Sequence, residues 1–316
     1  MVEWPDVQRA SASLILDVFA LGRALGDPLD LLLLAAVVQA NNAPVAARGD
    51  LQLRYAALSE PTPDHLRRPI SMHAVATSLG LSFESVRRRT HRLADRGLCR
   101  LSGEGAVVTA ELLGSAAFNA AAVVAYQRLQ EHYAALQTLG ALHGLQPPTA
   151  TLDEAEPPIR ATLRVLLDYL LRVLDDARAA FGDLTTCLLL FETVRCNTQH
   201  LGYAAADAAS RSLLPDGLRQ PVSVAILSRR LGFSAETTRR HARALEDART
   251  LVRAPGGLIV PAERLARPAA ARFATENLRH TRRMFSALSS LGILNTWTSH
   301  PRPDEIRRAG PERYAP

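Results

Sequence analysis

Two stretches of the chain place arginines at matching positions after a serine. The first reads SFESVRRRTHRL from Ser82, and the second reads SAETTRRHARAL from Ser234. In each stretch a glutamate stands two residues after the serine, and a pair of arginines begins five residues after it. Guanidinium groups form bidentate hydrogen bonds with phosphates and with guanine edges. This pattern on an exposed helix indicates contact with DNA, and the alternative is a solvated helix face with no ligand.

The two stretches belong to a long internal repeat. Residues 69–142 align with residues 221–294 without a gap, at a constant offset of 152 residues, and 22 of the 74 aligned positions are identical. In both copies a glycine, Gly80 or Gly232, stands two residues before the serine, where a tight turn suits glycine. The serine itself is a natural N-cap. Each copy is therefore predicted to fold as a helix, a turn and a second helix that enters the major groove of DNA.

The arginine-bearing helices also predict which side chains face the DNA. At 100° per residue, Val86, Thr90, Leu93 and Gly97 share one face, which should pack inward. The candidate DNA contacts on the helix start, the opposite face and its flanks are Ser82, Ser85, Arg87, Arg88, His91 and Arg92 in the first copy, and Ser234, Thr237, Arg239, Arg240 and Arg243 in the second. Arg100 and Arg253 are further candidates beyond these helices. The exposed faces agree at Glu84/Glu236, Arg88/Arg240 and Asp95/Asp247 and differ elsewhere, so we expect two related but unequal half-sites. The two glutamates fit either a cytosine contact or a favourable position beside the helix dipole.

Each arginine-bearing helix is followed by a predicted hairpin and then by a long helix. The segments LCRLSGEGAVVT and LVRAPGGLIVP place a glycine turn between short strand-like runs. Arg100 and Arg253 lie beside these turns and are candidate contacts from the hairpin. Pro268 suits the first turn of the second long helix, which puts the start of the first one near Ala116.

Two helices are predicted before each copy of the repeat. Residues 6–25 form an amphipathic helix, and Asp27 with Pro28 then caps and opens an apolar helix that ends near Asn41 and Asn42. In the second half Asp183 has the corresponding capping role. Asn41 and Asn197 occupy matching places and are predicted as helix C-caps, with a ligand contact as the alternative.

These elements predict a mainly α-helical chain of two tandem winged-helix domains, flanked by long helices and arranged as a single-chain pseudo-dimer. The predicted bounds are 1–148 for the first repeat with its DNA-binding segment at 63–113, 149–158 for a linker, 159–296 for the second repeat with its DNA-binding segment at 215–265, and 297–316 for a polar tail. The long loops 43–66 and 198–218 carry no assignment.

The order of helix, turn, helix and hairpin between flanking helices resembles transcription factors of the MarR (multiple-antibiotic-resistance regulator) type. The resemblance implies that residues 6–25 and 116–142 pair with residues 160–180 and 268–294, as the first and last helices do in dimers of that family. It also implies an effector cleft near His132, Tyr133 and Phe285, for which interior packing is the alternative. The hairpins SGEGAVV and APGGLIV lack the Asp and Arg pair usual in that family.

Composition is consistent with a nucleic-acid partner and indicates no enzyme. The net charge is +6, and all 37 basic residues are arginine, which favours polyanionic partners. Cys99, Cys187 and Cys196 have no metal-binding or redox spacing, and no zinc-site pattern, phosphate-binding glycine loop or nucleophile elbow occurs. We therefore expect no catalytic residues, cofactor or metal. The longest apolar run, residues 31–38, is too short to span a bilayer, and the amino terminus has no signal pattern, so we expect a cytoplasmic, nucleoid-associated protein without a membrane partner.

The expected function is that of a sequence-specific transcriptional regulator, with repression favoured, whose partner is double-stranded DNA. A small-molecule effector or an accessory protein is a further expected partner, and the chain is a monomeric pseudo-dimer or dimerises further. The alternatives are a plasmid-type replication initiator and a winged-helix scaffold that binds protein. The gapless repeat favours the regulator, since the halves of initiators tend to diverge, and the basic helices argue against the scaffold.

Overall fold

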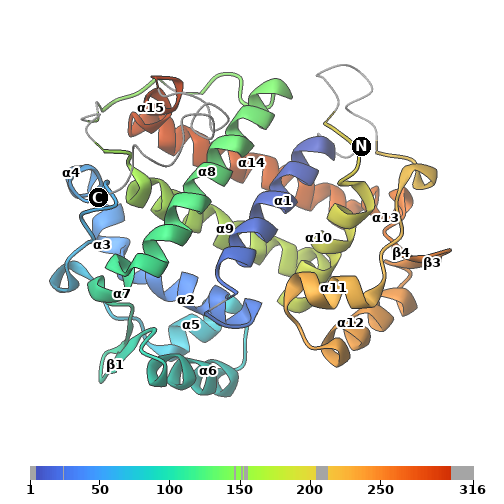
Figure 1. The fold of residues 1–316 in the computed structure, drawn as a ribbon, viewed down its shortest axis with the longest axis horizontal. Coiled ribbons are helices and arrows are strands. Elements are labelled where there is room, and N and C mark those ends of the chain that lie inside the picture. Colours follow the sequence, from blue (N-terminus) through green and yellow to red (C-terminus); the bar gives the residue numbers. More distant parts are fainter. Residues whose placement is uncertain are drawn as a thin grey trace.

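The computed structural model describes residues 5–23, 25–145, 147–150, 152, 156–203 and 213–299, and the fold is mainly α-helical with two small antiparallel sheets (Figure 1). The elements of the first half are α1 (Pro5–Leu21), α2 (Pro28–Asn41), α3 (Ala43–Ala46), α4 (Gly49–Arg54), the 3-10 turn Asp64–Leu66, α5 (Met72–Leu79), α6 (Phe83–Asp95), β1 (Arg100–Ser102), β2 (Gly105–Val107), α7 (Ala110–Gly114) and α8 (Ala116–Thr138).

The second half repeats this order. Its elements are α9 (Ile159–Phe181), α10 (Leu184–Thr198), the 3-10 turn Asp216–Leu218, α11 (Val224–Leu231), α12 (Ala235–Asp247), β3 (Val252–Ala254), β4 (Gly257–Ile259), α13 (Ala262–Leu265), α14 (Pro268–Ser290) and α15 (Ile293–Ser299). Residues 297–299, predicted as tail, belong to α15, and 300–316 lie outside the described residues. The unassigned loop 43–66 contains α3, α4 and a 3-10 turn, and residues 204–212 of the other loop lie outside the described part.

Helix starts follow the predicted capping residues. The Asp27 carboxylate accepts hydrogen bonds from the backbone N–H groups of Leu29 and Asp30, and Pro28 is the first residue of α2. Asp183 caps α10 in the same way through the N–H of Thr186. The long helices start at Ala116 and Pro268, as predicted. Local side-chain chemistry therefore sets these boundaries.

Residues 70–108, here called module 1, and residues 222–260, called module 2, share one local fold. In each, two helices meet at a glycine with positive φ, +60° at Gly80 and +76° at Gly232. A two-stranded hairpin follows, and a single bridge pairs it with Ile70 or Val222, the residue before the N-cap serine of the first helix. The backbones match even where the residues differ, since Gly97 and the aligned Arg249 both have positive φ.

One buried asparagine joins each module to the helices before it, Asn41 in the first half and Asn197 in the second, and the C-cap role predicted for both is wrong. Asn41 is the last residue of α2, and Asn42 is its C-cap. The Asn41 side-chain amide donates to the carbonyl oxygens of Arg68 and Ala106, and its oxygen accepts from the N–H of Val108.

Asn197 makes the matching contacts to Gln220, Leu258 and Val260, and Gln199 is the C-cap of α10. Both asparagines are fully buried. Each of them therefore satisfies backbone groups that water cannot reach.

The helices that open each half pack across the molecule. Helix α1 contacts α8 of its own half and α10 of the second half, while α9 contacts α14 and, in the first half, α2. Helix α1 also contacts α14, and α8 contacts α9. In Figure 1 helices α1, α8, α9, α10 and α14 fill the centre and upper part of the view, and α2 lies below them next to module 1. Module 1 is at the lower left and module 2 is at the lower right. No helix in the described ranges is both long enough and apolar enough to cross a membrane.

Replacing Asn41 with alanine should lower the free energy of unfolding by about 3 kcal/mol, because buried backbone groups lose their partners. Urea denaturation monitored by circular dichroism measures the change. The control is Thr138→Ala, which removes an exposed hydroxyl at the end of α8 and should change stability by less than about 0.5 kcal/mol. Equal stability of Asn41→Ala and the parent would contradict the bridging role.

Candidate nucleic-acid interface

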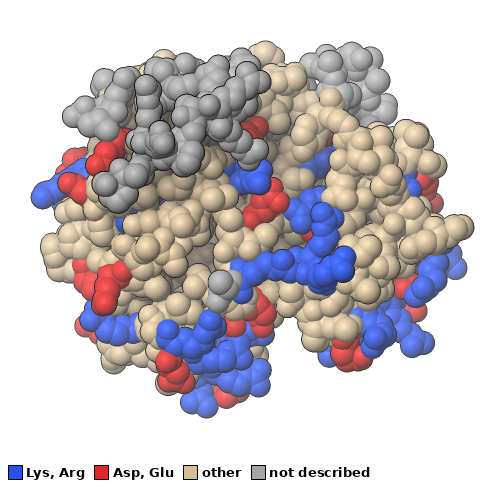
Figure 2. All heavy atoms as spheres, in the orientation of Figure 1, with Lys and Arg blue, Asp and Glu red and all other residues tan. Residues whose placement is uncertain are grey.

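The two arginine-bearing helices, α6 and α12, lie on the same side of the molecule. Figure 2 shows basic side chains gathered over both of them, on two lobes separated by a notch. The inward face is largely as predicted, since Val86, Thr90 and Leu93 are buried. Gly97 is an exception, because α6 ends at Asp95 and Gly97 is exposed beyond it. Both helices therefore present their polar faces to solvent in one direction.

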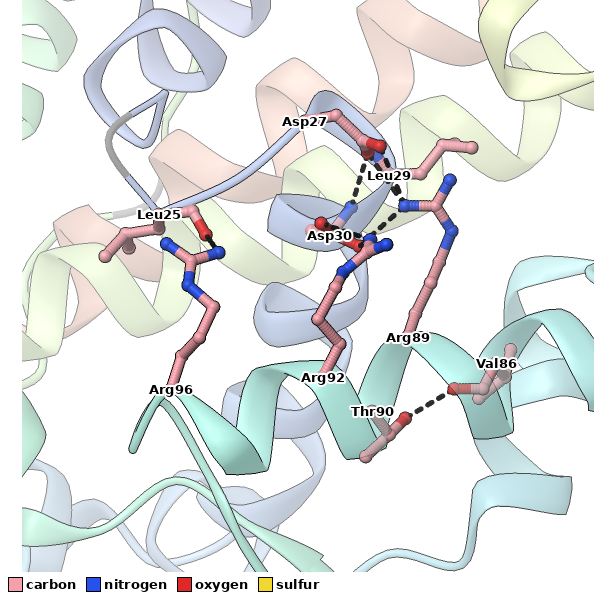
Figure 3. Close-up of polar contacts among 9 residues, drawn as sticks. All are labelled: Leu25, Asp27, Leu29, Asp30, Val86, Arg89, Thr90, Arg92 and Arg96. Atoms are coloured by element: carbon pink, nitrogen blue, oxygen red, sulfur yellow. Dashed lines mark hydrogen bonds and ion pairs between the residues drawn. The ribbon is translucent and has the colours of Figure 1, made fainter.

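Helix α6 is held to the start of α2 by ion pairs (Figure 3). Arg89 donates to the carboxylates of Asp27 and Asp30, at 2.9 and 2.6 Å, and Arg92 donates to Asp30 at 2.8 Å. The Asp30 side chain is only 4% exposed, so two guanidinium groups compensate a buried carboxylate. Arg96 adds a bond to the carbonyl oxygen of Leu25.

This anchor changes the assignment of two arginines. The sequence prediction places Arg92 on the free outer face, whereas its guanidinium is turned toward α2. It omits Arg89, which lies at the edge of the inward face and is half-buried. The sequence feature that could have indicated this pairing is the pair of acids at the start of α2, because two neighbouring carboxylates need cationic partners when one of them is buried.

Helix α12 is anchored at the same place by different chemistry. His241, aligned with Arg89, contacts the Thr186 hydroxyl at 3.0 Å and lies 3.6 Å from the Asp183 carboxylate. Ala244 takes the place of Arg92. The docking of α12 therefore uses one imidazole where α6 uses two guanidinium groups, and the two modules are unequal in their anchoring as well as in their exposed residues.

Several candidate contacts are free to meet a ligand. Within the described part of the chain, Arg88, His91 and Arg243 are exposed and have no side-chain hydrogen bond or ion pair. Arg240 is exposed and contacts only the ring of neighbouring His241, at 3.4 Å. Ser82 and Ser234 act as N-caps toward the N–H groups of Ser85 and Thr237, and Ser85 and Thr237 are half-buried.

The two glutamates pair with the flanking arginines. Glu84 accepts two hydrogen bonds from Arg87, at 3.1 and 3.2 Å, and Glu236 pairs with Arg239 at 2.6 Å. The hydrogen bond from Arg87 lowers the pKa of Glu84. Exposed pairs of this kind contribute less than about 1 kcal/mol. Arg87 and Arg239 can therefore leave their glutamates for a phosphate at little cost.

The two hairpin arginines are not placed as predicted. Arg100 opens β1, away from the turn, and pairs with Asp64 at 2.9 Å. Arg253 lies in the middle of β3 and pairs with Glu246 of α12 at 2.8 Å. The turns themselves are at residues 103–104 and 255–256. Both guanidinium groups are exposed, but neither is at the tip of its hairpin.

The three residues expected near an effector cleft form a packed aromatic cluster. The rings of His132 and Phe285 stack with their centroids 6.0 Å apart, and Tyr133 contacts both Phe285 and Trp297. None of the three lines any of the cavities described below. The packing alternative therefore fits these residues better than a ligand contact.

Other side chains that could bind a metal ion or act as nucleophiles are already paired or are buried and unreactive. Asp176, Glu276 and His280 lie close enough to share a cation, but His280 pairs with Asp176 at 2.8 Å and Glu276 pairs with Arg279. All three cysteines are free and buried. Burial raises the pKa of Cys99 to about 11 and that of Cys187 to about 12, so these thiols carry little thiolate at neutral pH.

Comparison of the chain with protein-family models, with curated proteins and with solved structures finds no match.

The buried imidazole of His132 should make stability depend on pH. Burial lowers its pKa to about 3, whereas an unfolded histidine has a pKa of about 6.5. The neutral ring is therefore fully compatible with the fold above pH 6.5, and stability falls as the pH drops below 6.5 because the unfolded chain takes up a proton. Between about pH 6.5 and 5 this loss is about 2 kcal/mol.

The variant His132→Phe keeps an aromatic ring and removes the titration. Its free energy of unfolding should fall less than that of the parent over this range, by about the same 2 kcal/mol. Urea denaturation at several pH values measures this. Thr138→Ala, which changes no titrating group, serves as the control and should keep the parent's slope. A parent slope in His132→Phe would contradict the assignment.

Proposed function

We propose that modules 1 and 2 are winged helices, and that the chain is a single-chain pseudo-dimer that binds one DNA duplex sequence-specifically as a transcriptional regulator, with repression favoured. The observation that carries the proposal is the exposure of both arginine-bearing helices, α6 and α12, on one side of the molecule. One face can then meet two major grooves of the same duplex, about 34 Å apart if the halves are related by two-fold symmetry.

The contacts between the halves support such symmetry. Tyr133 and Phe285 are aligned in the repeat and their rings contact each other, with centroids 5.2 Å apart, as expected of residues near a two-fold axis. Arg23 and Arg178 also occupy matching positions after α1 and within α9. Arg23 donates to the carbonyl oxygen of Arg229 beside the turn of module 2, and Arg178 lies against Gly80 in the turn of module 1.

The free and paired arginines suggest a division of contacts. Arg88 and Arg240, exposed without a carboxylate partner, suit base edges. Arg87 and Arg239, held loosely by glutamates, suit the phosphate backbone, which supplies affinity without sequence information. Arg92 has a mainly structural role through Asp30.

Replacement of Arg88 or Arg240 with alanine should weaken binding to a selected operator by about 1–3 kcal/mol each and relax the base preference in one half-site. The operator is obtained by selection from random duplexes, and affinities are measured by fluorescence anisotropy. Arg128→Ala, which removes an exposed arginine of α8, is the control and should bind like the parent. If both recognition variants also bind like the parent, the groove assignment fails.

Replacement of Arg87 should act differently. Affinity for every sequence should fall, and the slope of log K against log salt should decrease in magnitude by about 1.

Mapping of bound sites in the genome separates a regulator from a replication initiator, since the first predicts sites at promoters and the second predicts a repeat array at an origin.

A further inference from the structure

Two cavities lie at equivalent places in the two halves. The larger, here called the first-half cavity, has a volume of about 270 Å³ and lies among α1, α2, α8 and the start of α9. The smaller, called the second-half cavity, has a volume of about 90 Å³ and lies among α10, α14, the end of α9 and the start of α1. Each is therefore bounded by helices of its own half and by the first helix of the other half.

Most wall residues of the second-half cavity have an aligned counterpart in the wall of the first-half cavity. At the start of the opening helices the offset is 155, which matches Arg9 with Arg164 and Ile15 with Leu170. Between α2 and α10 the offset of aligned residues is 156. In the repeat that follows the offset is 152, which matches Arg67 with Arg219. The two cavities are thus copies of one site that have diverged.

The first divergence is in volume. Phe191 and Phe273 enter the wall of the second-half cavity where the first-half cavity has Ala35 and Ala121. At one position the difference is reversed, because the first-half cavity has Phe118 where the second-half cavity has Ala270. The net result is that aromatic rings fill much of the second site, whereas the first remains open and mainly lined by leucine, alanine and valine.

The second divergence is in charge. In the second-half cavity Arg9 pairs with Asp6 at 2.5 Å and Arg219 pairs with Asp216 at 3.2 Å. At the first-half cavity the position of Asp6 is taken by Ala161 of α9, so Arg164 has no carboxylate partner among the described residues.

A third arginine, Arg160, lines the first-half cavity where the second has Pro5. Arg67 has one carboxylate nearby, that of Asp64 at 3.5 Å, and Asp64 also pairs with Arg100. The first-half cavity therefore has three guanidinium groups against one shared carboxylate.

These guanidinium groups are buried and incompletely satisfied. Arg160 and Arg164 donate mainly to backbone carbonyl oxygens, which are neutral acceptors. Desolvation and mutual repulsion lower the pKa of each to about 10. Nη1 of Arg67 and Nε of Arg164 are buried without a hydrogen-bond partner. Buried cations beside an apolar space suit a ligand that is anionic at one end.

We propose that the first-half cavity binds one amphipathic organic acid per chain, with the carboxylate at Arg67, Arg160 and Arg164 and an apolar body among the side chains of α1, α2 and α8. The volume is near the lower end of the range for ligand pockets, about 300–1,000 Å³, which suits a single ring or a chain of moderate length. The second-half cavity, narrowed and with its charges paired, does not bind this ligand.

A regulatory consequence rests on the proposed function. Leu25 lines the first-half cavity, and its carbonyl oxygen accepts the hydrogen bond from Arg96, the C-cap residue of α6. Gly22, also in the wall, precedes Arg23, which reaches module 2. Occupancy of the cavity therefore acts on a segment that contacts both modules, and the ligand should change the affinity for DNA.

The test uses the full chain without DNA, so that its failure is distinct from a failure of DNA binding. Decanoate is the probe, and decan-1-ol is the neutral control of the same length. Isothermal titration calorimetry should give one decanoate per chain, bound roughly ten-fold or more tightly than decanol because of the charge-assisted hydrogen bonds. Absence of decanoate binding, or equal affinity for the two probes, overturns the proposal.

Variants that copy residues of the second-half cavity into the first-half cavity test the two divergences separately. Ala161→Asp supplies the carboxylate that Asp6 provides in the other half, and it should reduce decanoate affinity roughly ten-fold or more while decanol affinity stays the same. Ala121→Phe should reduce the binding of both probes. Thermal unfolding and circular dichroism establish that each variant is folded, and retention of parental decanoate affinity by folded Ala161→Asp overturns the charge assignment.

The matched control is Phe273→Ala, which enlarges the second-half cavity. Because Asp6 and Asp216 still neutralise its arginines, the stoichiometry should remain one decanoate per chain. A second decanoate of similar affinity would show that volume alone governs binding, and would overturn the assigned role of the unpaired arginines.

Discussion

The packing of α1 on α10, matched by that of α9 on α2, is the contact on which the rest of the structure depends. Leu14 and Ile15 of α1 and Leu170 and Val173 of α9 are almost fully buried, and burial of each such side chain contributes about 1.5–3 kcal/mol. Because each opening helix belongs to the core of both halves, neither half can move freely against the other. This constraint places α6 and α12 on the same side of the molecule. It also means that each cavity has a wall formed by both halves.

Within this shared frame the two halves have diverged where packing permits. Acids at the start of α2 and of α10 hold the arginine-bearing helix in both halves. Asp27 and Asp30 pair with Arg89 and Arg92 in one half, and Asp183 lies beside His241 in the other. The cavities have changed in the same manner, one narrowed by Phe191 and Phe273 and the other left open with unpaired arginines. A duplicated chain can assign different tasks to its two copies, since each copy needs only to preserve the contacts that hold the frame. A homodimer has no such freedom, because one substitution changes both sites.

Features with a local cause were predictable. Asp27, Asp183, Ser82 and Ser234 cap their helices, and the glycine turns and hairpins lie at the predicted places, because each depends on neighbours within a few residues. Residues whose hydrogen-bond partners are far away in the sequence were predicted wrongly. Asn41 has the appearance of a helix end, but its hydrogen-bond partners are 27 and 65 residues away along the chain. Arg92 has the periodicity of an outer face, yet it pairs with a carboxylate 62 residues before it. The long side chain of arginine reaches further than helical periodicity describes.

The amino-acid sequence by itself determined the repeat, the helices and their caps, and the positions of the arginines in each copy, since these follow from residue types and short-range hydrogen bonds. Only the tertiary structure decided that both arginine-bearing helices are exposed on one side, which of their arginines are free, and which of two equivalent cavities is open. The physical reason is that facing, pairing and cavity volume depend on which helix packs on which, and helices far apart in the chain are brought together by burial of apolar surface, a force without direction along the sequence.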